Sequence, residues 1–465
     1  MDIKELSYNY IEAYNLVKKC GEHSVFNCSM AIDIVNKDKY FNIVGKNITV
    51  VCYSDNIEYC LFKGIVREVS VGSDLHRNMA EITAMSTSVQ EDEISYCRIF
   101  QAKDNKYSDI LAENKLEIKN CKLVLSELAG KKYEKIALQN KETNFVFIKR
   151  LAEEAGVRLW VDDTTVPANI CLKNELIKGC TEIKLDEILS LKKQRINNNS
   201  ENIKVEIVVL ERYINFGRVV KIEGNSSEYV ISSMKAYSSH GIDRFEYSLE
   251  EKEYKKICIS KEDDNIAINF TAKVKRNDDP DKKGRLQVEF TNKDLKDINK
   301  DNPRWIPYSS PYTGKASGIV FIPDKDDVVD VIYYNGECCA IVANRENKLL
   351  EECFDPNVKY IGNNNKQRII WKENSLELLS NENKIYLDND KIELIVGKNK
   401  IIIDKEQIIL AVNDTKLKLD NKDVIVNASN SKMNVGKSGI SAIGKKMEMK
   451  SDGQINISGS KINLT

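Results

Sequence analysis

The sequence predicts a mainly β protein with an α+β N-terminal part, a small antiparallel barrel, and a C-terminal β-helix in which three chains intertwine. Three observations predict this fold class. Strand-like segments and one clear helix fill residues 1–255. Five of the seven prolines lie between Pro280 and Pro323, among short strand-like segments. From residue 366 onward, aliphatic residues recur in i, i+2 pairs between polar turns.

Length and charge exclude several classes of protein. The 465 residues are enough for about three domains. The 70 basic and 71 acidic side chains cancel, which argues against nucleic acid or an anionic membrane as an electrostatic partner. No apolar run is long enough to span a membrane. The first residues lack the basic start and apolar stretch of a signal peptide, so assembly in the cytoplasm is expected.

The residues that hold metals are few or badly spaced. The twelve cysteines include no CxxC pair, and there are three histidines. A structural zinc site needs closely spaced pairs of such ligands, so we expect no metal site and no cofactor. In a reducing compartment the cysteines are expected to be free and mostly buried.

Residues 1–255 read as mixed α and β structure. One helix is clear over Asn144–Ala155, where apolar residues follow helical spacing, Thr143 can cap the start and Gly156 can end it. The polar stretch Lys192–Ile203 is predicted to be a loop. Segments that alternate or run apolar at strand length are Ile48–Cys52, Cys60–Val66 and Glu81–Met85.

Residues 256–350 have the pattern of a small barrel. Turn signals at Asp279-Pro280 and Lys283-Gly284 make one hairpin, and Asn335-Gly336 has the signature of a type I′ turn. Short antiparallel strands in so few residues favour a barrel of the OB type. The expected strands are Thr271–Lys275, Arg285–Phe290, Arg304–Tyr308, Gly318–Ile322, Val328–Tyr334 and Cys338–Ala343.

Residues 351–383 are predicted to be a connector, and residues 384–465 a needle. Its aliphatic pairs recur mostly every seven residues, but the i, i+2 spacing within each pair is that of a strand, not of a coiled coil. The pattern predicts about eleven strands of three to five residues, which would stack into a needle about 50 Å long. Turns this short cannot enclose a core in one chain, so three chains are expected to wind together. The side chains predicted to meet on the trimer axis are Ile392, Leu394, Ile401, Ile403, Ile408, Leu410, Leu417, Leu419, Val424, Val426, Met433, Val435, Met447, Met449, Ile455, Ile457, Ile462 and Leu464.

Motifs that carry chemistry elsewhere do not fit here. Val435–Ser438 reads VGKS, but Ser431 stands where a phosphate loop has its first glycine, and the motif lies inside the strand repeat. The acidic clusters Asn277–Asp281 and Asp324–Asp327 lack the spacing of a calcium loop and are predicted to be solvated turns. No nucleophile–base pairing is evident. We therefore expect no catalytic residue and no enzyme activity.

Two stretches resemble a known family. Ile136–Trp160 (IALQNKETNFVFIKRLAEEAGVRLW) and Tyr96–Leu111 (YCRIFQAKDNKYSDIL) are similar to signature segments of VgrG and phage tail hub proteins. Asp279–Val342 looks like the OB domain of that family, and the needle follows in the same order. One departure is Asp326-Asp327-Val328-Val329, where the family usually has Gly-Asp-Glu-Val.

The resemblance implies the central spike of a contractile injection system: type VI secretion, a phage tail, or a phage-like bacteriocin. It implies a hub of two barrel-like subdomains that caps a hexameric tail tube, an OB collar, and a homotrimeric needle that contacts baseplate proteins and crosses a target envelope transiently. The chain stops at Thr465 and lacks histidine in the needle, so a separate PAAR-like tip protein and cargo effector are expected. Delivery outside the cell or into the target would follow contraction.

One alternative stays open. An OB barrel on a trimeric β-stalk also fits a phage tail adhesin or a sugar-binding tail-tip protein. Such a protein needs an aromatic-rich binding face, for which Trp305, Trp371 and scattered tyrosines are the candidates.

Overall fold

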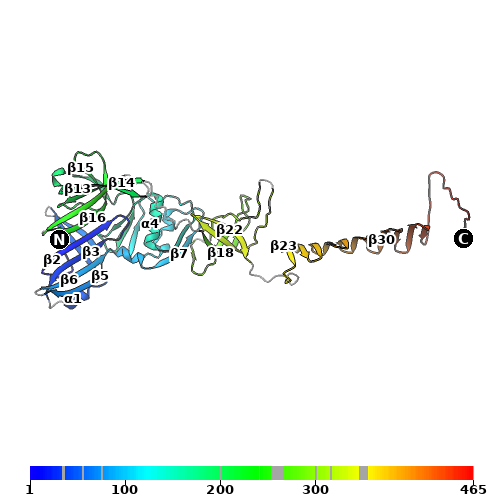
Figure 1. Ribbon diagram of the computed structural model, residues 1–465, viewed down its shortest axis with the longest axis horizontal. Coiled ribbons are helices and arrows are strands. Elements are labelled where there is room, and N and C mark those ends of the chain that lie inside the picture. Colours follow the sequence, from blue (N-terminus) through cyan, green and yellow to red (C-terminus); the bar gives the residue numbers. More distant parts are fainter. Residues whose placement is uncertain are drawn as a thin grey trace. The chain divides into compact units, whose positions relative to one another are not determined.

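The computed structural model divides the chain into two compact units, Met1–Arg345 and Glu346–Thr465 (Figure 1). No described helix has the length and apolar character needed to cross a bilayer. The structure describes residues 1–33, 37–54, 57–74, 77–198, 201–239, 241–252, 267–298, 301–314, 317–344 and 354–463.

The first unit is built on a twelve-stranded sheet with the order β1-β4-β5-β6-β3-β2-β16-β17-β14-β13, to which β15 and β12 attach at β16. The two halves of the sheet meet where β2 and β16 pair antiparallel, from Ser233 opposite Lys19 to Tyr237 opposite Asn15. Its strands are β1 (Asp2–Ile3), β2 (Tyr10–Lys19), β3 (Val25–Ile32), β4 (Asn47–Ser54), β5 (Ile57–Asp74), β6 (Arg77–Met85), β12 (Ile177–Ile183), β13 (Ser190–Asn198), β14 (Glu201–Leu210), β15 (Arg218–Ile222), β16 (Tyr229–Ser239) and β17 (Ile242–Glu251).

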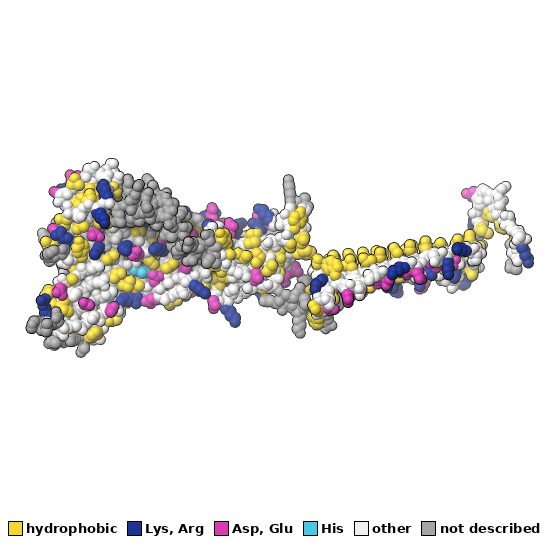
Figure 2. Space-filling view, in the orientation of Figure 1, with side chains coloured by type: hydrophobic (Ala, Val, Ile, Leu, Met, Phe, Trp, Pro, Cys, Tyr) yellow, Lys and Arg dark blue, Asp and Glu magenta, His cyan; other side chains and the backbone are white. Residues whose placement is uncertain are grey.

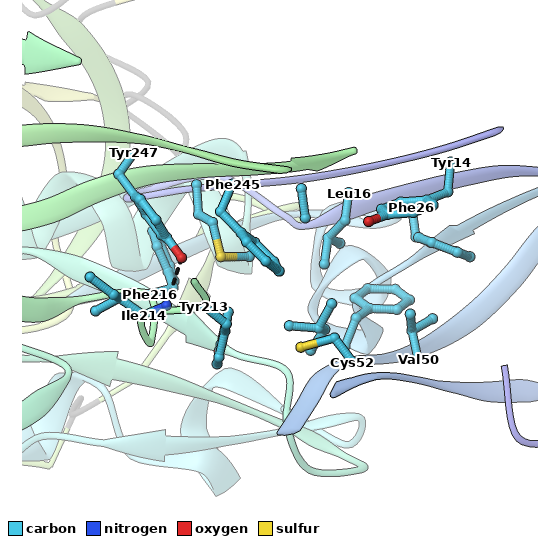
Figure 3. Packing of buried hydrophobic residues seen from close by; sticks show 14 of the residues in the cluster. Tyr14, Leu16, Phe26, Val50, Cys52, Tyr213, Ile214, Phe216, Phe245 and Tyr247 are labelled. Atoms are coloured by element: carbon cyan, nitrogen blue, oxygen red, sulfur yellow. Dashed lines mark hydrogen bonds between the residues drawn. The ribbon is translucent and has the colours of Figure 1, made fainter. Parts of the chain in front are cut away.

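The core of this sheet is shared by both halves. Leu16 and Phe26 from the first half belong to the same buried cluster as Phe245 and Tyr247 from the second (Figure 3). The hydroxyl of Tyr247 accepts a hydrogen bond from the backbone N–H of Ile214 at 2.6 Å, which satisfies the one polar atom of this buried ring. The halves therefore form one continuous packed body.

The predicted loop over Lys192–Ile203 is wrong. These residues form the end of a hairpin in which β13 and β14 pair along nine positions, from Ser190 opposite Val209 to Asn198 opposite Glu201. The asparagines that indicated a loop, such as Asn197, Asn198 and Asn202, are paired at the described ends of the two strands.

The predicted helix is confirmed at both ends. Helix α4 spans Asn144–Ala155, the Thr143 hydroxyl accepts from the N–H of Val146, and Gly156 ends the helix in the left-handed conformation. Its apolar face packs in a second buried cluster. The other elements of the first unit outside the large sheet and the barrel sheet are β7 (Ser95–Phe100), β8 (Cys121–Val124), β9 (Ala137–Thr143), β10 (Leu159–Asp162), β11 (Ala168–Leu172), β20 (Lys296–Asp297), the short helices α1 (Lys37–Phe41), α2 (Tyr107–Ile110) and α3 (Glu113–Leu116), and the 3-10 turns η2 (Thr87–Asp92) and η3 (Leu185–Glu187).

The barrel region contains a four-stranded sheet, β19-β18-β21-β22. Residues Arg304–Tyr308 and Gly318–Ile322, expected to be strands, make only isolated bridges, such as Leu286 with Ile306. Prolines flank both segments and remove the N–H donors that a longer ladder needs. The strands are β18 (Ile268–Arg276), β19 (Gln287–Phe290), β21 (Val328–Tyr334) and β22 (Glu337–Asn344).

Two barrel turns can be compared with their predictions. Asn335 and Gly336 have φ values of 47° and 84°, as a type I′ turn requires. Asp279 is not the solvated turn residue that was expected: its carboxylate is buried and binds Arg285 in bidentate fashion, at 2.7 and 3.0 Å. It also accepts the N–H groups of Asp281 and Lys283, so it organises the β18–β19 loop. The Arg285 guanidinium holds the pKa of Asp279 well below its usual range.

The second unit is a ladder of eleven strands, each paired antiparallel with the next along the chain. The ladder begins at Lys359, inside the segment expected to be a connector, and ends at Ile443. The strands are β23 (Lys359–Gly362), β24 (Gln367–Lys372), β25 (Ser375–Ser380), β26 (Asn383–Asp388), β27 (Lys391–Val396), β28 (Asn399–Asp404), β29 (Gln407–Val412), β30 (Thr415–Asp420), β31 (Asp423–Ala428), β32 (Ser431–Gly436) and β33 (Gly439–Ile443).

The pairing of the ladder can be compared with the predicted needle. In the single chain, hydrogen-bonded neighbours in the ladder are consecutive strands, and the winding of three chains stays a prediction. Most strands have six residues and are joined by two-residue turns, so a single chain completes the backbone pairing by itself. Whether other copies cover the face of this ladder is a separate question, which depends on its side chains.

Candidate assembly site

The candidate site is the apolar face of the ladder. Strand register places the aliphatic pairs directly opposite one another: Ile392 pairs with Ile403, and Leu394 with Ile401. The same register continues to β33, so the pairs form two parallel columns across the sheet. Cross-strand aliphatic contacts of this kind stabilise a sheet, but each side chain is covered from the side only.

These columns remain open to solvent in the single chain. Ile392 is 38% exposed and Ile403 is 40% exposed, although both are aliphatic residues in the middle of regular strands. Figure 2 shows the result as a continuous hydrophobic stripe along one side of the second unit, with charged side chains on the other side. Contiguous apolar surface of this length is rare on monomeric proteins and marks an interaction site.

The opposite face of the ladder combines paired charges with aliphatic side chains. Glu377 is buried between Lys372 and Lys384, with N–O distances of 3.0 and 3.2 Å, and Lys418 pairs with Asp420 at 3.1 Å. Ile402 and Ile409 lie opposite each other on this face and are half-buried. This face is therefore more polar than the face with the columns.

The two edges of the ladder carry different turns. On one edge, Asp388, Asp404 and Asp420 recur every sixteen residues, and each accepts the N–H groups of the residues two and three positions later at 2.8–2.9 Å. We call this the Asp edge. These N–H groups lower the pKa of Asp420 to about 2. The other edge, which we call the left-handed edge, turns at residues with positive φ, namely Asn381, Gly397, Asn413 and Ser429.

Twelve of the eighteen residues predicted for a trimer axis, from Ile392 to Val435, lie together in the two columns. Met447, Met449, Ile455, Ile457 and Ile462 do not: they follow the last strand and are exposed, with no strand assigned to them. Leu464 lies outside the described residues.

The prediction missed the beginning of the columns. Leu376 and Leu378 pair with Leu387 and Ile385, and they continue both columns into β25. Ile369 and Trp371 extend them into β24. Their i, i+2 spacing was visible in the sequence, and the steps between pairs are similar.

The motifs set aside as non-catalytic lie in structural positions. Val435 ends the apolar column in β32, and Lys437-Ser438 form the turn to β33, with no helix following. In the described part of the chain, no cluster of His, Cys, Asp and Glu is arranged to hold a metal ion. The ten described cysteines are free, and burial raises the pKa of Cys28 and Cys52 to about 12. Cys258, Cys353 and Lys315 lie outside the described residues.

The family-like stretches of the first unit meet at one buried arginine. Arg98 is 1% exposed, and its guanidinium donates to the side-chain oxygens of Gln139 and Asn144, both at 2.9 Å. The ring of Tyr96 stacks 3.6 Å from it. Arg98 and Tyr96 come from one quoted stretch and Gln139 and Asn144 from the other. These residues therefore join the two family-like stretches to each other.

Comparison with known proteins identifies the barrel. Residues 270–342 match the family described as the type VI secretion system/phage-baseplate injector OB domain. The barrel is therefore similar to an injector OB domain. The match includes the whole four-stranded sheet except the ends of β18 and β22. No curated protein sequence matches the chain.

Solved structures extend the likeness beyond the injector OB domain. An E. coli type VI secretion component, c3393, described as similar to T4 bacteriophage tail proteins gp27 and gp5, superposes with a TM-score of 0.52 at 10% identity, covering 74% of this chain and 99% of that one. The Francisella PdpA–VgrG complex in its half-lidded form gives 0.52 at 9% identity, covering 90% and 83%. At this identity the likeness shows the fold, and it confirms the resemblance to the VgrG and phage tail hub family.

Proposed function

We propose that the chain is one subunit of the homotrimeric central spike of a contractile injection system. The first unit would join the inner tube and baseplate, and the ladder would form the needle toward the membrane-puncturing tip. The observation that carries this proposal is the exposed double column of aliphatic residues on the ladder. The match of residues 270–342 to the injector OB family supports the type of machine.

Copies of the same chain are the best cover for this face. Complete burial of an aliphatic side chain contributes about 1.5–3 kcal/mol, and each column residue gains only part of this in the single chain. Three ladders with their apolar faces turned inward make a triangular prism with one chain per side. Each side of the prism then has eleven strands, as in the predicted needle, and one chain supplies all the strands of a side.

The chain is proposed to act by shape, without catalysis. Among the described residues, the polar contacts serve to pack the core, form turns or solvate the surface. Proposed partners are the hexameric tube protein, baseplate proteins, a PAAR-like tip protein and a cargo effector. The solved Francisella complex of VgrG with PdpA supports the association of a further protein. Assembly in the cytoplasm and delivery outward on contraction are part of the proposal.

A matched pair of substitutions tests the assembly. Ile403→Asp places a carboxylate in the column, whereas Ile402→Asp changes the neighbouring residue of β28, which faces the other side. Native mass measurement of the 53.0 kDa chain is expected to give about 160 kDa for the wild type and for Ile402→Asp. Ile403→Asp is expected to give monomers, because a buried unpaired charge is costly.

A wild-type monomer or dimer at micromolar concentration would overturn the trimer. Equal loss of assembly in both variants would mean that the apolar face is not the contact. Hydrogen exchange of the first unit serves as the control for folding, since both substitutions lie in the second.

A further inference from the structure

The apolar face of the ladder is wider at one edge than at the other. At the left-handed edge, the hairpins close with Val396 opposite Asn399 and with Val412 opposite Thr415, and these residues share the apolar face with the columns. At the Asp edge, the residues next to the turns, such as Asp404, face the polar side. The face that carries the columns therefore extends one residue further toward the left-handed edge, where Val396 and Val412 alternate with polar residues.

The projecting valines are more exposed than the column residues of the neighbouring strands. Val396 is 58% exposed and Val412 is 57% exposed, compared with 38% for Ile392 in the column. Neither valine is needed to complete the two columns. Something beyond the edge of this sheet must cover them if the face is an interface.

From this asymmetry we infer that the left-handed edge of one copy packs over the Asp edge of the next copy. The inference rests on the proposed homotrimer and specifies how its subunits meet. The two edges are different surfaces, so the contact is heterologous, and such contacts close into a ring when the rotation allows. A ring of three sheets then has three identical corners.

In this arrangement, charges at the left-handed edge of one copy face opposite charges at the Asp edge of the next copy. Lys398 lies in a turn of the left-handed edge, and Glu406 lies in the Asp-edge turn eight residues later. The next repeat has the signs reversed, with Asp414 on the left-handed edge and Lys422 on the Asp edge. In the described ladder, these four side chains make no ion pair within the chain. Opposite charges in successive repeats also fix the register between copies.

One further pair occupies the same register. Glu382 of the left-handed edge would lie near Asp390 of the Asp edge, which are like charges. Asp390 is already paired with Lys405 of its own chain at 2.5 Å. Because Lys405 neutralises Asp390, the approach of Glu382 to Asp390 adds little repulsion.

Charge reversal at one corner tests the inference. Asp414→Lys and Lys422→Asp are made singly and together, and dissociation of the trimer is followed in urea by native mass. Each single variant is expected to weaken the trimer about ten-fold, because three modest surface pairs turn repulsive at once. The double variant is expected to recover most of this loss, and 1 M salt to remove the differences. Lys437→Asp, on the Asp edge opposite the uncharged turn of Asn430, is the control and is expected to change little.

The outcomes separate the two proposals. A monomeric wild type overturns the spike itself. A trimer that tolerates both single reversals, or a double variant as weak as the singles, overturns the edge pairing and leaves the trimer standing. A loss in Lys437→Asp equal to that in Lys422→Asp shows that charge alone, and not the corner, is responsible, and it also overturns the pairing.

Discussion

The sheet of the first unit and the ladder of the second are both antiparallel and both rich in aliphatic residues, but they bury them differently. In the large sheet, Leu16, Phe26 and Phe62 are fully buried within one chain. In the ladder, side chains of the same kind in equally regular strands stay about two-fifths exposed. The first unit has closed its core, and the second has completed only its backbone pairing. The difference teaches that regular secondary structure can form without a closed core, which the ladder would gain only in the proposed trimer.

The largest expected effect comes from emptying the closed core. Phe62→Ala removes a fully buried ring that lies 5.9 Å from Phe26, and we expect a loss of about 3–5 kcal/mol in the stability of the first unit. The loss should not depend on protein concentration. Ile392→Ala in the ladder should instead lower the protection of the ladder against hydrogen exchange, by an amount that depends on protein concentration. Hydrogen exchange resolved by region measures both, and a concentration dependence in the first unit would contradict the comparison.

A smaller effect concerns pH. His23 lies where the β2–β3 turn meets α4: its ring hydrogen bonds Ser88 at 2.7 Å and Asp92 at 2.9 Å, and it packs 3.9 Å from Phe145. Burial lowers the pKa of His23, while Asp92 acts in the opposite direction and Lys149 and Arg67 add to the lowering. The unfolded chain, with a pKa near 6.5, then binds more protons than the folded one.

The first unit should therefore be fully stable above about pH 6.5 and lose stability as the pH falls from there through the lowered folded pKa of His23. His23→Gln keeps a polar side chain and should flatten the slope of stability against pH in this window, while His76 and His240 stay in place as internal controls. Urea midpoints of the first unit between pH 5 and 8 measure it. An unchanged slope in His23→Gln would assign the effect to another group.

The sequence predicted the strands of the ladder, but it did not predict which strands pair within one chain. The i, i+2 pairs gave strands and one apolar face, which the register of Ile392 with Ile403 confirms. The winding of three chains was inferred because short strands were thought unable to pair alone. Positive-φ residues such as Asn413 make turns tight enough for each strand to pair with the next within one chain. Spacing alone does not distinguish these two tracings.

The end of the ladder and the buried polar contacts were harder to predict. Met447 and Met449 have the same spacing as the earlier pairs, but the regular Asp of the turn is already replaced at Gly436, and the strands end soon after. Asp279 and Arg98 are charged, and composition places such residues at the surface. Only their partners in space, Arg285 for the first and Gln139 with Asn144 for the second, explain their burial.

The smallest expected effect lies in the turns of the Asp edge. Asp420 accepts two backbone N–H groups, at 2.9 and 2.8 Å, and Asp420→Ala leaves both to water. We expect a modest fall in the urea midpoint of the ladder, confined to β30 and β31, whereas Asn430→Ala, in an uncharged turn of the left-handed edge, should have less effect. Because its folded pKa is lowered to about 2, the contribution of Asp420 is complete above its ordinary pKa and is lost as the pH falls toward 2. Local hydrogen exchange in this hairpin decides the matter: equal effects of the two substitutions would show that side-chain capping does not hold the turn, and that the tight backbone geometry alone sets the sixteen-residue repeat.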